Sequence, residues 1–185
     1  NEPVHRYHIF FLKHGTNKAI MMTMDKIKIL LAEDHVVVRE GTRQLIQNEE
    51  DMEVVGEAGD GKEAVELATR TKPDVIIMDI TMPVMNGIEA TKLIKVKLPT
   101  TAILILTAYD NDQYVSALLE AGAAGYLLKN IKGKELIEAI RAVHSGESVL
   151  HPKIARKVLN RFALSANQPP GETTTDVLSE REMEV

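Results

Sequence analysis

Short apolar runs alternate with segments of helical spacing along residues 27–145. The apolar runs span residues 27–32, 74–79, 102–107 and 125–129, and residues 53–57, with Val54 and Val55, are a further strand candidate. Apolar positions at helical spacing follow each run, over residues 36–48, 62–70, 88–97, 111–121 and 132–145. Near-continuous apolar runs are typical of strands that helices cover on both faces. The alternation therefore predicts an α/β fold with a parallel sheet and right-handed crossovers.

The regular pattern predicts one domain over residues 25–145, flanked by segments of a different kind. Residues 1–24 lack clear periodicity, and we expect a leader or a disordered extension there. Residues 146–176 are expected to be a linker, with a short helix at about 152–162 and a polar stretch that contains Pro169-Pro170-Gly171. Periodicity alone does not give the strand order, and 2-1-3-4-5 is one of the two common orders in such sheets.

Composition excludes several classes of protein. The 185 residues include no Cys, which excludes a disulfide scaffold, a thiolate metal site and a cysteine nucleophile. No apolar run approaches the roughly 18 residues that a membrane span needs, so we expect a cytoplasmic protein without a membrane partner. The net charge is −5, and residues 25–145 carry 20 acidic against 14 basic residues. This acidity argues against a domain wrapped around nucleic acid, but it leaves a separate DNA-binding module open.

Three acidic side chains follow the ends of predicted strands. Glu33 and Asp34 come after the first strand, and Asp79 closes the third. In doubly wound sheets, ligands bind outside the carboxyl ends of the strands, where the strand order reverses. Carboxylates that converge there repel one another, and Mg²⁺ would relieve the repulsion. On the acids alone, solvated strand ends explain the pattern equally well.

Two further strand ends favour a phosphoryl site. Thr107 closes the fourth strand and Lys129 the fifth, so a hydroxyl and an ammonium would face the same edge as the carboxylates. Phosphoryl transfer needs mainly positioning and charge neutralisation, which these groups would supply. An aspartate such as Asp79 can act as the nucleophile in a covalent phosphoryl intermediate.

The motifs around these residues resemble the receiver domain of response regulators, in the NarL/FixJ branch. The matching segments are Ile29-Leu-Leu-Ala-Glu-Asp-His35, Val38-Arg-Glu-Gly41, Asp79-Ile-Thr-Met-Pro-Val-Met-Asn-Gly87, Leu106-Thr-Ala108 and Tyr126-Leu-Leu-Lys129. The resemblance covers about 120 residues. It implies a flavodoxin-like (βα)5 fold with strand order 2-1-3-4-5, and a two-component response regulator that controls transcription.

The resemblance also implies roles for individual residues. Asp79 would accept a phosphoryl group from a sensor histidine kinase. Glu33, Asp34 and Asp79 would hold Mg²⁺ together with the backbone carbonyl of Thr81. Lys129 would contact the phosphoryl group. Thr107 and Tyr126 would form a switch pair that favours a homodimer after phosphorylation.

The last nine residues of the sequence carry a second resemblance. Residues 177–185 resemble the opening helix of a LuxR-type helix-turn-helix domain, with Ser179 and Glu182 at capping-box spacing. DNA would bind through the full-length output domain and not through this fragment.

One alternative function is that of a receiver that acts only by protein–protein contact. Another is an aspartate-nucleophile phosphohydrolase, but Thr81 stands where that chemistry needs a general acid.

Overall fold

A six-stranded parallel sheet forms the centre of the computed structural model, which describes residues 25–109, 112–156 and 158–159. The strands are β1 (Ile27–Ala32), β2 (Met52–Ala58), β3 (Val75–Met78), β4 (Ala102–Thr107), β5 (Gly125–Leu128) and β6 (Val149–Leu150). Their order is β2-β1-β3-β4-β5-β6. The α/β class and the relative order of the first five strands are thus as predicted, and β6 is an addition at one edge.

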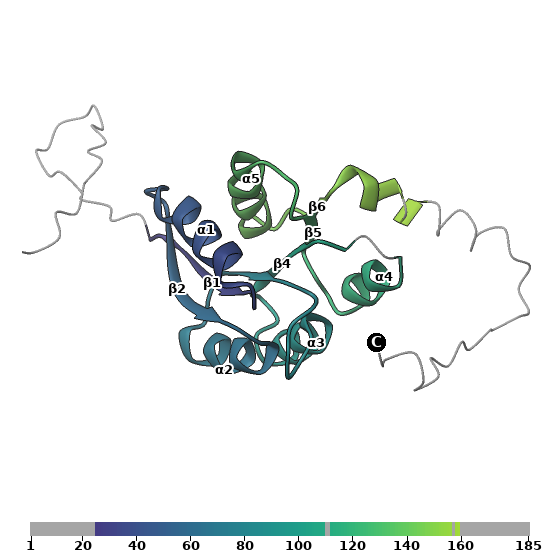
Figure 1. Ribbon diagram of the computed structural model, residues 1–185, viewed down its shortest axis with the longest axis horizontal. Coiled ribbons are helices and arrows are strands. Elements are labelled where there is room, and N and C mark those ends of the chain that lie inside the picture. The colour runs from purple at the N-terminus through teal and green to yellow at the C-terminus, as the bar shows by residue number, and fades with distance from the viewer. Residues whose placement is uncertain (1–24, 110–111, 157, 160–185) are drawn as a thin grey trace, which may run out of the picture.

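Helices cover both faces of this sheet (Figure 1). They are α1 (Val36–Gln47), α2 (Gly61–Thr71), α3 (Gly87–Lys97), α4 (Asp112–Glu120) and α5 (Gly133–His144). The core is divided accordingly: Ile29 and Leu31 point to the side of α1 and α5, and Leu30 and Ala32 to the other side. Burying each such aliphatic side chain contributes about 1.5–3 kcal/mol, which explains why the strands read as continuous apolar runs.

β6 lies within the segment that we expected to be a linker. It pairs in parallel with β5, with Leu150 opposite Tyr126. Helical residues follow at 152–156 and 158–159, and the side chain of Ile154 is buried in the same cluster as Tyr126. Residues 149–154 therefore pack against the sheet. The remaining expectations for residues 160–185 and 1–24 lie outside the described residues.

Side-chain caps fix the starts of α2 and α3 near the end of β3. The Asp60 carboxylate accepts a hydrogen bond from the backbone N–H of Glu63 at 2.8 Å, and the Asn86 side chain accepts one from Glu89 at 2.9 Å. The Gly61 N–H donates to the Met85 carbonyl at 3.1 Å, which ties α2 to the loop between β3 and α3. Caps of this kind are worth about 1 kcal/mol each.

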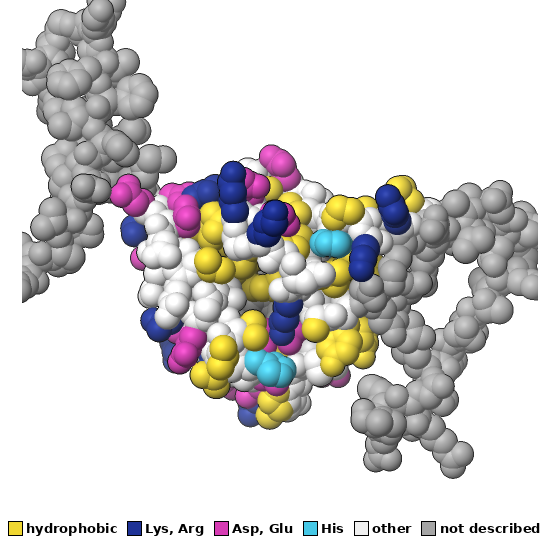
Figure 2. All heavy atoms as spheres, turned by 45° about the horizontal axis from the view of Figure 1, so that its top comes forward, with side chains coloured by type: hydrophobic (Ala, Val, Ile, Leu, Met, Phe, Trp, Pro, Cys, Tyr) yellow, Lys and Arg dark blue, Asp and Glu magenta, His cyan; other side chains and the backbone are white. Residues whose placement is uncertain are grey.

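Acidic and basic side chains lie next to one another on the face that α1 and α5 form (Figure 2). Arg141 of α5 donates hydrogen bonds to both carboxylate oxygens of Asp51 at 2.8 Å and to Glu49 at 2.6 Å. These contacts join α5 to the segment between α1 and β2. Among the described residues, no helix is long and apolar enough to cross a membrane.

Candidate functional site

The strand order brings the predicted site residues to one edge of the sheet. Glu33 and Asp34 follow β1, Asp79 follows β3, Thr107 is the last residue of β4, and Lys129 follows β5. β1 lies between β2 and β3, so the strand order reverses where the acidic residues meet. The carboxyl ends of parallel strands at such a point form the usual ligand site of open α/β sheets.

An ion-pair network links the carboxylates to Lys129. The Lys129 ammonium lies 2.8 Å from Asp79 Oδ2 and 2.7 Å from Glu33 Oε2. Both carboxylates are buried, with Asp79 3% and Glu33 7% exposed. Burial lowers the pKa of Lys129, but the hydrogen bonds and charges of Asp79 and Glu33 outweigh burial, so the net shift is upward. Lys129 is therefore a cation at neutral pH.

The backbone around Asp79 fixes the position of its carboxylate. Asp79 Oδ1 accepts a hydrogen bond from the N–H of Ile80 at 2.8 Å, and the Asp79 N–H donates to the Ala32 carbonyl at 2.9 Å. A Cβ atom on Gly87 would lie 2.0 Å from the Asp79 carbonyl oxygen. The loop can therefore close over β3 only because residue 87 is glycine.

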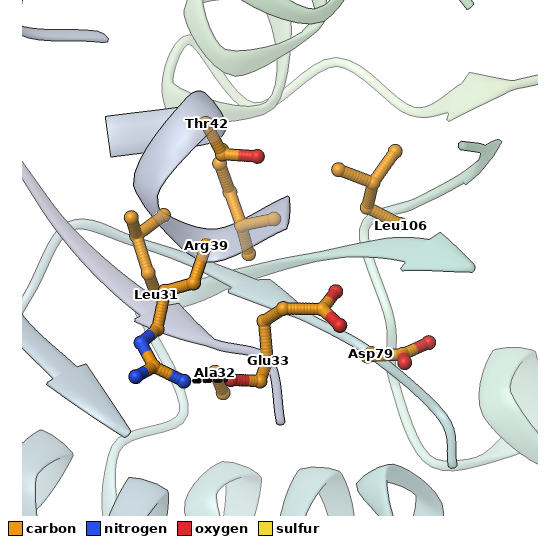
Figure 3. A pocket seen from close by; sticks show the side chains of 8 residues that line it. Leu31, Ala32, Glu33, Arg39, Thr42, Asp79 and Leu106 are labelled. Atoms are coloured by element: carbon orange, nitrogen blue, oxygen red, sulfur yellow. Dashed lines mark hydrogen bonds between the residues drawn. The ribbon is translucent and has the colours of Figure 1, made fainter. Parts of the chain in front are cut away.

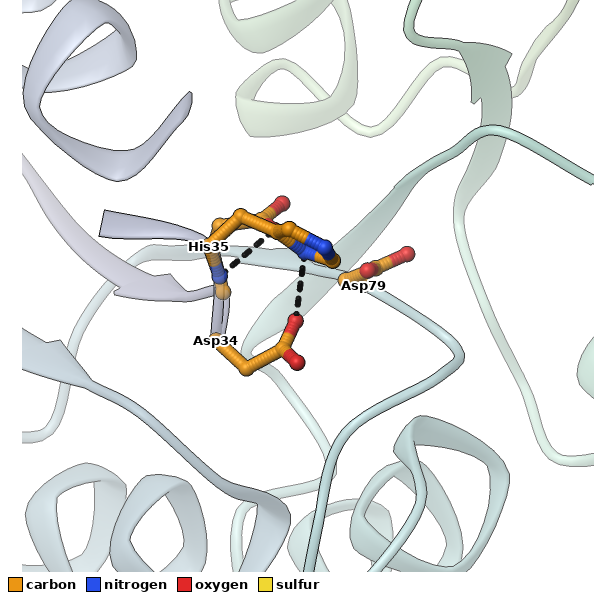
Figure 4. A group of neighbouring side chains, drawn as sticks. Asp34, His35 and Asp79 are labelled. Carbon is orange, nitrogen blue, oxygen red and sulfur yellow. Dashed lines mark hydrogen bonds and ion pairs between the residues drawn. The ribbon is translucent and has the colours of Figure 1, made fainter. Parts of the chain in front are cut away.

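His35 stands beside the acidic pair, and our sequence reasoning did not single it out. Its Nδ1 atom lies 2.9 Å from Asp34 Oδ1 and 3.1 Å from Glu33 Oε1 (Figure 4). One atom each of Glu33, Asp34, His35 and Asp79 lies within 4.8 Å of the others. The available sequence signal was its place directly after two acids at a strand end.

The donor atoms of this group fit a divalent cation. Asp34 Oδ1 is buried and makes no hydrogen bond with any described residue, although the side chain as a whole is 29% exposed. The contact of that oxygen with His35 Nδ1 is an ion pair at 2.9 Å, and the three carboxylates of the group supply the oxygen ligands that a hard divalent cation prefers. Thr81, whose backbone carbonyl is the remaining predicted ligand, is an exposed residue of the loop after β3.

A small cavity lies behind the carboxylates, between β1 and α1 (Figure 3). It is lined by Glu33, Arg39, Thr42, Asp79 and apolar side chains, and its volume of about 10 Å³ is at the lower limit for one water molecule. Arg39 donates a hydrogen bond to the backbone carbonyl of Glu33 at 2.5 Å. The Arg39 Nε atom also lies 3.5 Å from Glu57, so the end of β1 is tied to β2.

Thr107 and Tyr126 are both fully buried, and they are connected through the backbone of Tyr109. Thr107 Oγ1 accepts a hydrogen bond from the Tyr109 N–H at 3.4 Å. The Tyr126 hydroxyl donates to the Tyr109 carbonyl at 3.0 Å. The two residues of the predicted switch pair therefore contact the same residue: Thr107 binds the backbone N–H of Tyr109, and Tyr126 binds its carbonyl.

Fold and site together define a class of protein, the doubly wound α/β domains that carry a carboxylate–lysine site at the switch point of the sheet. Residues 29–141 match the family model of the response regulator receiver domain, and the chain belongs to this family. The resemblance that the motifs indicated is therefore confirmed.

Curated relatives and solved structures agree with this family. An uncharacterized transcriptional regulatory protein, YxjL of Bacillus subtilis, is 46% identical over 164 residues, which are 89% of this chain and 75% of the relative. The oxygen regulatory protein NreC of Staphylococcus aureus is 41% identical over 86% of this chain and 75% of its own length. A LuxR-family two-component response regulator from Aurantimonas sp. superimposes with a TM-score of 0.71 and 37% identity, covering 75% of this chain and 99% of that one.

Proposed function

We propose that Asp79 accepts a phosphoryl group from a phosphohistidine of a sensor histidine kinase. The observation that carries this proposal is the buried contact of Lys129 with both Asp79 and Glu33. In the transfer, an Asp79 oxygen forms a bond to phosphorus while the phosphorus–nitrogen bond to the kinase breaks. The histidine nitrogen keeps the electron pair of the broken bond.

The chain's own residues would supply orientation and charge for this transfer. The Ile80 N–H holds one Asp79 oxygen, and the Lys129 ammonium neutralises charge on the other. Glu33, Asp34, Asp79 and the Thr81 carbonyl would hold Mg²⁺, which supplies positive charge for the phosphoryl oxygens when it is bound. Thr81 stands where a phosphohydrolase needs its general acid, so we propose that the chain is not a dedicated enzyme.

Thr107 and Tyr126 would then pass on the phosphorylation state. We propose that the Thr107 hydroxyl leaves the Tyr109 N–H and donates to the phosphoryl group. That exchange would release the segment that Tyr126 holds through the Tyr109 carbonyl. The phosphoryl group can shift the equilibrium between the two conformations only by the difference in its interaction free energy with each of them.

The output that we propose is control of transcription, through a homodimer and DNA binding by a domain outside the receiver. The names of the relatives support this step, because YxjL and DegU are described as transcriptional regulatory proteins. The proposed receiver is residues 25–145, and residues 146–176 are the proposed connection to the output domain that begins at 177–185.

Phosphorylation of the purified chain tests the proposal. The chain is incubated with Mg²⁺ and a small-molecule acyl phosphate, and its intact mass is measured. We expect the wild type to gain one phosphoryl group and Asp79→Asn to gain none. Asp74→Asn is the matched control, because the Asp74 carboxylate accepts a hydrogen bond from the backbone N–H of Lys28 at the opposite end of the sheet. Equal adducts on the wild type and Asp79→Asn would show that Asp79 is not the acceptor.

A further inference from the structure

We infer that residues 149–156 form an arm that docks reversibly on the edge of the sheet, and that phosphorylation of Asp79 releases this arm. The inference rests on the proposed function, since the trigger is the proposed movement of Tyr126. It adds a contact within the chain that changes with the phosphorylation state. The segment after the receiver would thus be held while Asp79 is free and released once Asp79 carries a phosphoryl group.

Tyr126 connects the arm to the segment that follows β4. Its hydroxyl donates to the Tyr109 carbonyl at 3.0 Å, and its own carbonyl accepts a hydrogen bond from the N–H of His151 at 2.9 Å. The Tyr109 N–H in turn donates to the hydroxyl of Thr107 at the end of β4. One residue of β5 therefore contacts the proposed switch segment with its side chain and the arm with its backbone.

The arm also shares a buried cluster with the Tyr126 ring. Ile154 is 0% exposed in this cluster, which includes Val115 and Leu118 of α4. Tyr126 is the largest of the fully buried side chains among the described residues. Because protein interiors are closely packed, displacement of this ring changes the space in which Ile154 lies. Docking of the arm should therefore weaken when the Tyr126 ring moves.

Few contacts hold the arm, so it can leave the sheet without unfolding of the domain. β6 pairs with β5 over only two residue pairs, and Ile154 is the one buried side chain among the described residues that follow β6. Segments with few buried apolar contacts open locally at a lower free energy than the whole domain. Figure 1 shows β6 at the edge of the sheet, with the short helix of the arm leading away from it.

Amide hydrogen exchange in the full chain tests release of the arm. Trifluoroberyllate with Mg²⁺ is the probe, as a non-covalent analogue of the phosphoryl group, and fluorine NMR measures its binding. The His151 N–H reports docking, because its acceptor is the Tyr126 carbonyl. The Ala124 N–H is the internal reference, since it donates to the Ile103 carbonyl of β4 at 2.8 Å. Bound trifluoroberyllate should accelerate exchange at His151 at least about fivefold and leave Ala124 unchanged.

A substitution in the arm tests docking without any ligand. Ile154→Ala removes the buried side chain and should accelerate exchange at His151 at least about tenfold. Leu159→Ala is the matched control, because the Leu159 side chain is 67% exposed, and exchange should stay unchanged. Coupling is reciprocal, so Ile154→Ala should also bind trifluoroberyllate more tightly than wild type. If Ile154→Ala loses protection at Ala124 as well, Ile154→Val replaces it, with a smaller acceleration in the same direction.

The possible failures are distinguishable. Equal exchange at His151 with and without bound trifluoroberyllate would show that β6 is a permanent strand, and would overturn the inference while the proposed function stands. Equal acceleration at His151 and Ala124 would contradict it too, since the whole sheet would then loosen. If trifluoroberyllate does not bind and acyl phosphate leaves no adduct on Asp79, the proposed function fails and the release falls with it. Unchanged exchange at His151 in Ile154→Ala would show that this side chain does not hold the arm, and would overturn the docking contact on which the inference depends.

Discussion

The Lys129 ammonium lies 2.8 Å from the Asp79 carboxylate, and this contact joins the ends of two strands that are not neighbours in the sheet. Lys129 follows β5 and Asp79 follows β3, so the pair spans the end of β4. Glu33, which directly follows β1, contacts the same ammonium at 2.7 Å. One cation therefore connects three strand ends, and it offsets much of the repulsion between buried carboxylates.

Replacing Lys129 by Met should lower the free energy of unfolding by about 1–3 kcal/mol. The substitution leaves two buried carboxylates without their cation, and breaking a fully buried pair costs about 3–5 kcal/mol. Because the Lys129 side chain is 18% exposed, we expect a smaller loss. Urea unfolding at pH 7 measures it. Lys134→Met is the control, since the Lys134 side chain is 86% exposed and should change stability by less than about 0.5 kcal/mol. Equal effects of both variants would contradict the prediction.

Three glycines give a second prediction, because an added methyl group meets very different surroundings at each. In Gly87→Ala the new Cβ would lie 2.0 Å from the Asp79 carbonyl, and in Gly61→Ala 2.4 Å from the Met85 carbonyl. The backbone must shift in both, and we expect each to destabilise the fold by about 1–3 kcal/mol. Gly87→Ala should also slow phosphorylation of Asp79.

Gly41→Ala is the matched control for these two variants. Gly41 lies inside α1, and nothing is within 4 Å of its added Cβ. Alanine in a helix interior is favoured over glycine, so this variant should be more stable than wild type by about 0.5–1 kcal/mol. Thermal unfolding of all three variants provides the comparison. If Gly61→Ala and Gly41→Ala shift the transition in the same direction, the close approach of α2 to the loop after β3 is wrong.

The sequence predicted the first five strands closely. Four of them, β1, β3, β4 and β5, are largely buried apolar runs, whereas the edge strand β2 is half-exposed and carries Glu53 and Glu57. The sequence did not predict β6, since Val149 and Leu150 form only two residues of strand and carry no periodic signal. β6 exists because its backbone pairs with the edge of β5, and because Ile154 behind it is buried. Both are tertiary contacts that a local pattern does not contain.

The site was predictable to a similar extent. The motif positions identified Asp79, Glu33 and Lys129, and the strand order placed them at one edge. The sequence did not predict that Lys129 contacts Glu33 as well as Asp79, because that depends on side-chain conformations at three strand ends. His35 was missed for the same reason: its approach to Asp34 follows from the turn at the start of α1.

The contact of Arg141 with Asp51 predicts a pH-dependent contribution to stability. The hydrogen bonds from Arg141 lower the pKa of Asp51 from its ordinary value of 3.8. A carboxylate whose pKa is lowered in the folded state stabilises the fold at pH values above its ordinary pKa. This stabilisation is lost as the pH falls through the folded-state pKa. Asp51→Asn should therefore cost about 0.5–1 kcal/mol at pH 7, a value typical of an exposed ion pair.

Unfolding curves of wild type and Asp51→Asn between pH 2 and pH 7 measure this effect. The difference in unfolding free energy between the two proteins should narrow once the pH falls below 3.8. It should also shrink at high salt, because the Asp51 side chain is 45% exposed. Glu138→Gln removes a pair with Lys134 whose side chains are 60% and 86% exposed, and it serves as the control. A gap that stays constant down to pH 2 would rule out the carboxylate as its cause.

Tyr126→Phe tests the connection between Tyr126 and Tyr109. The substitution keeps the buried ring but removes the hydroxyl that donates to the Tyr109 carbonyl at 3.0 Å. Losing one such hydrogen bond should cost about 0.5–1.5 kcal/mol. Amide hydrogen exchange should accelerate at Tyr109, because among the described residues its N–H is held by a long, 3.4 Å bond to Thr107. Tyr114→Phe is the control, since the ring of Tyr114 packs edge-on against Tyr109 and keeps this contact. Unchanged exchange at Tyr109 in Tyr126→Phe would show that the hydroxyl does not hold this segment, and would remove the proposed route from Thr107 to Tyr126.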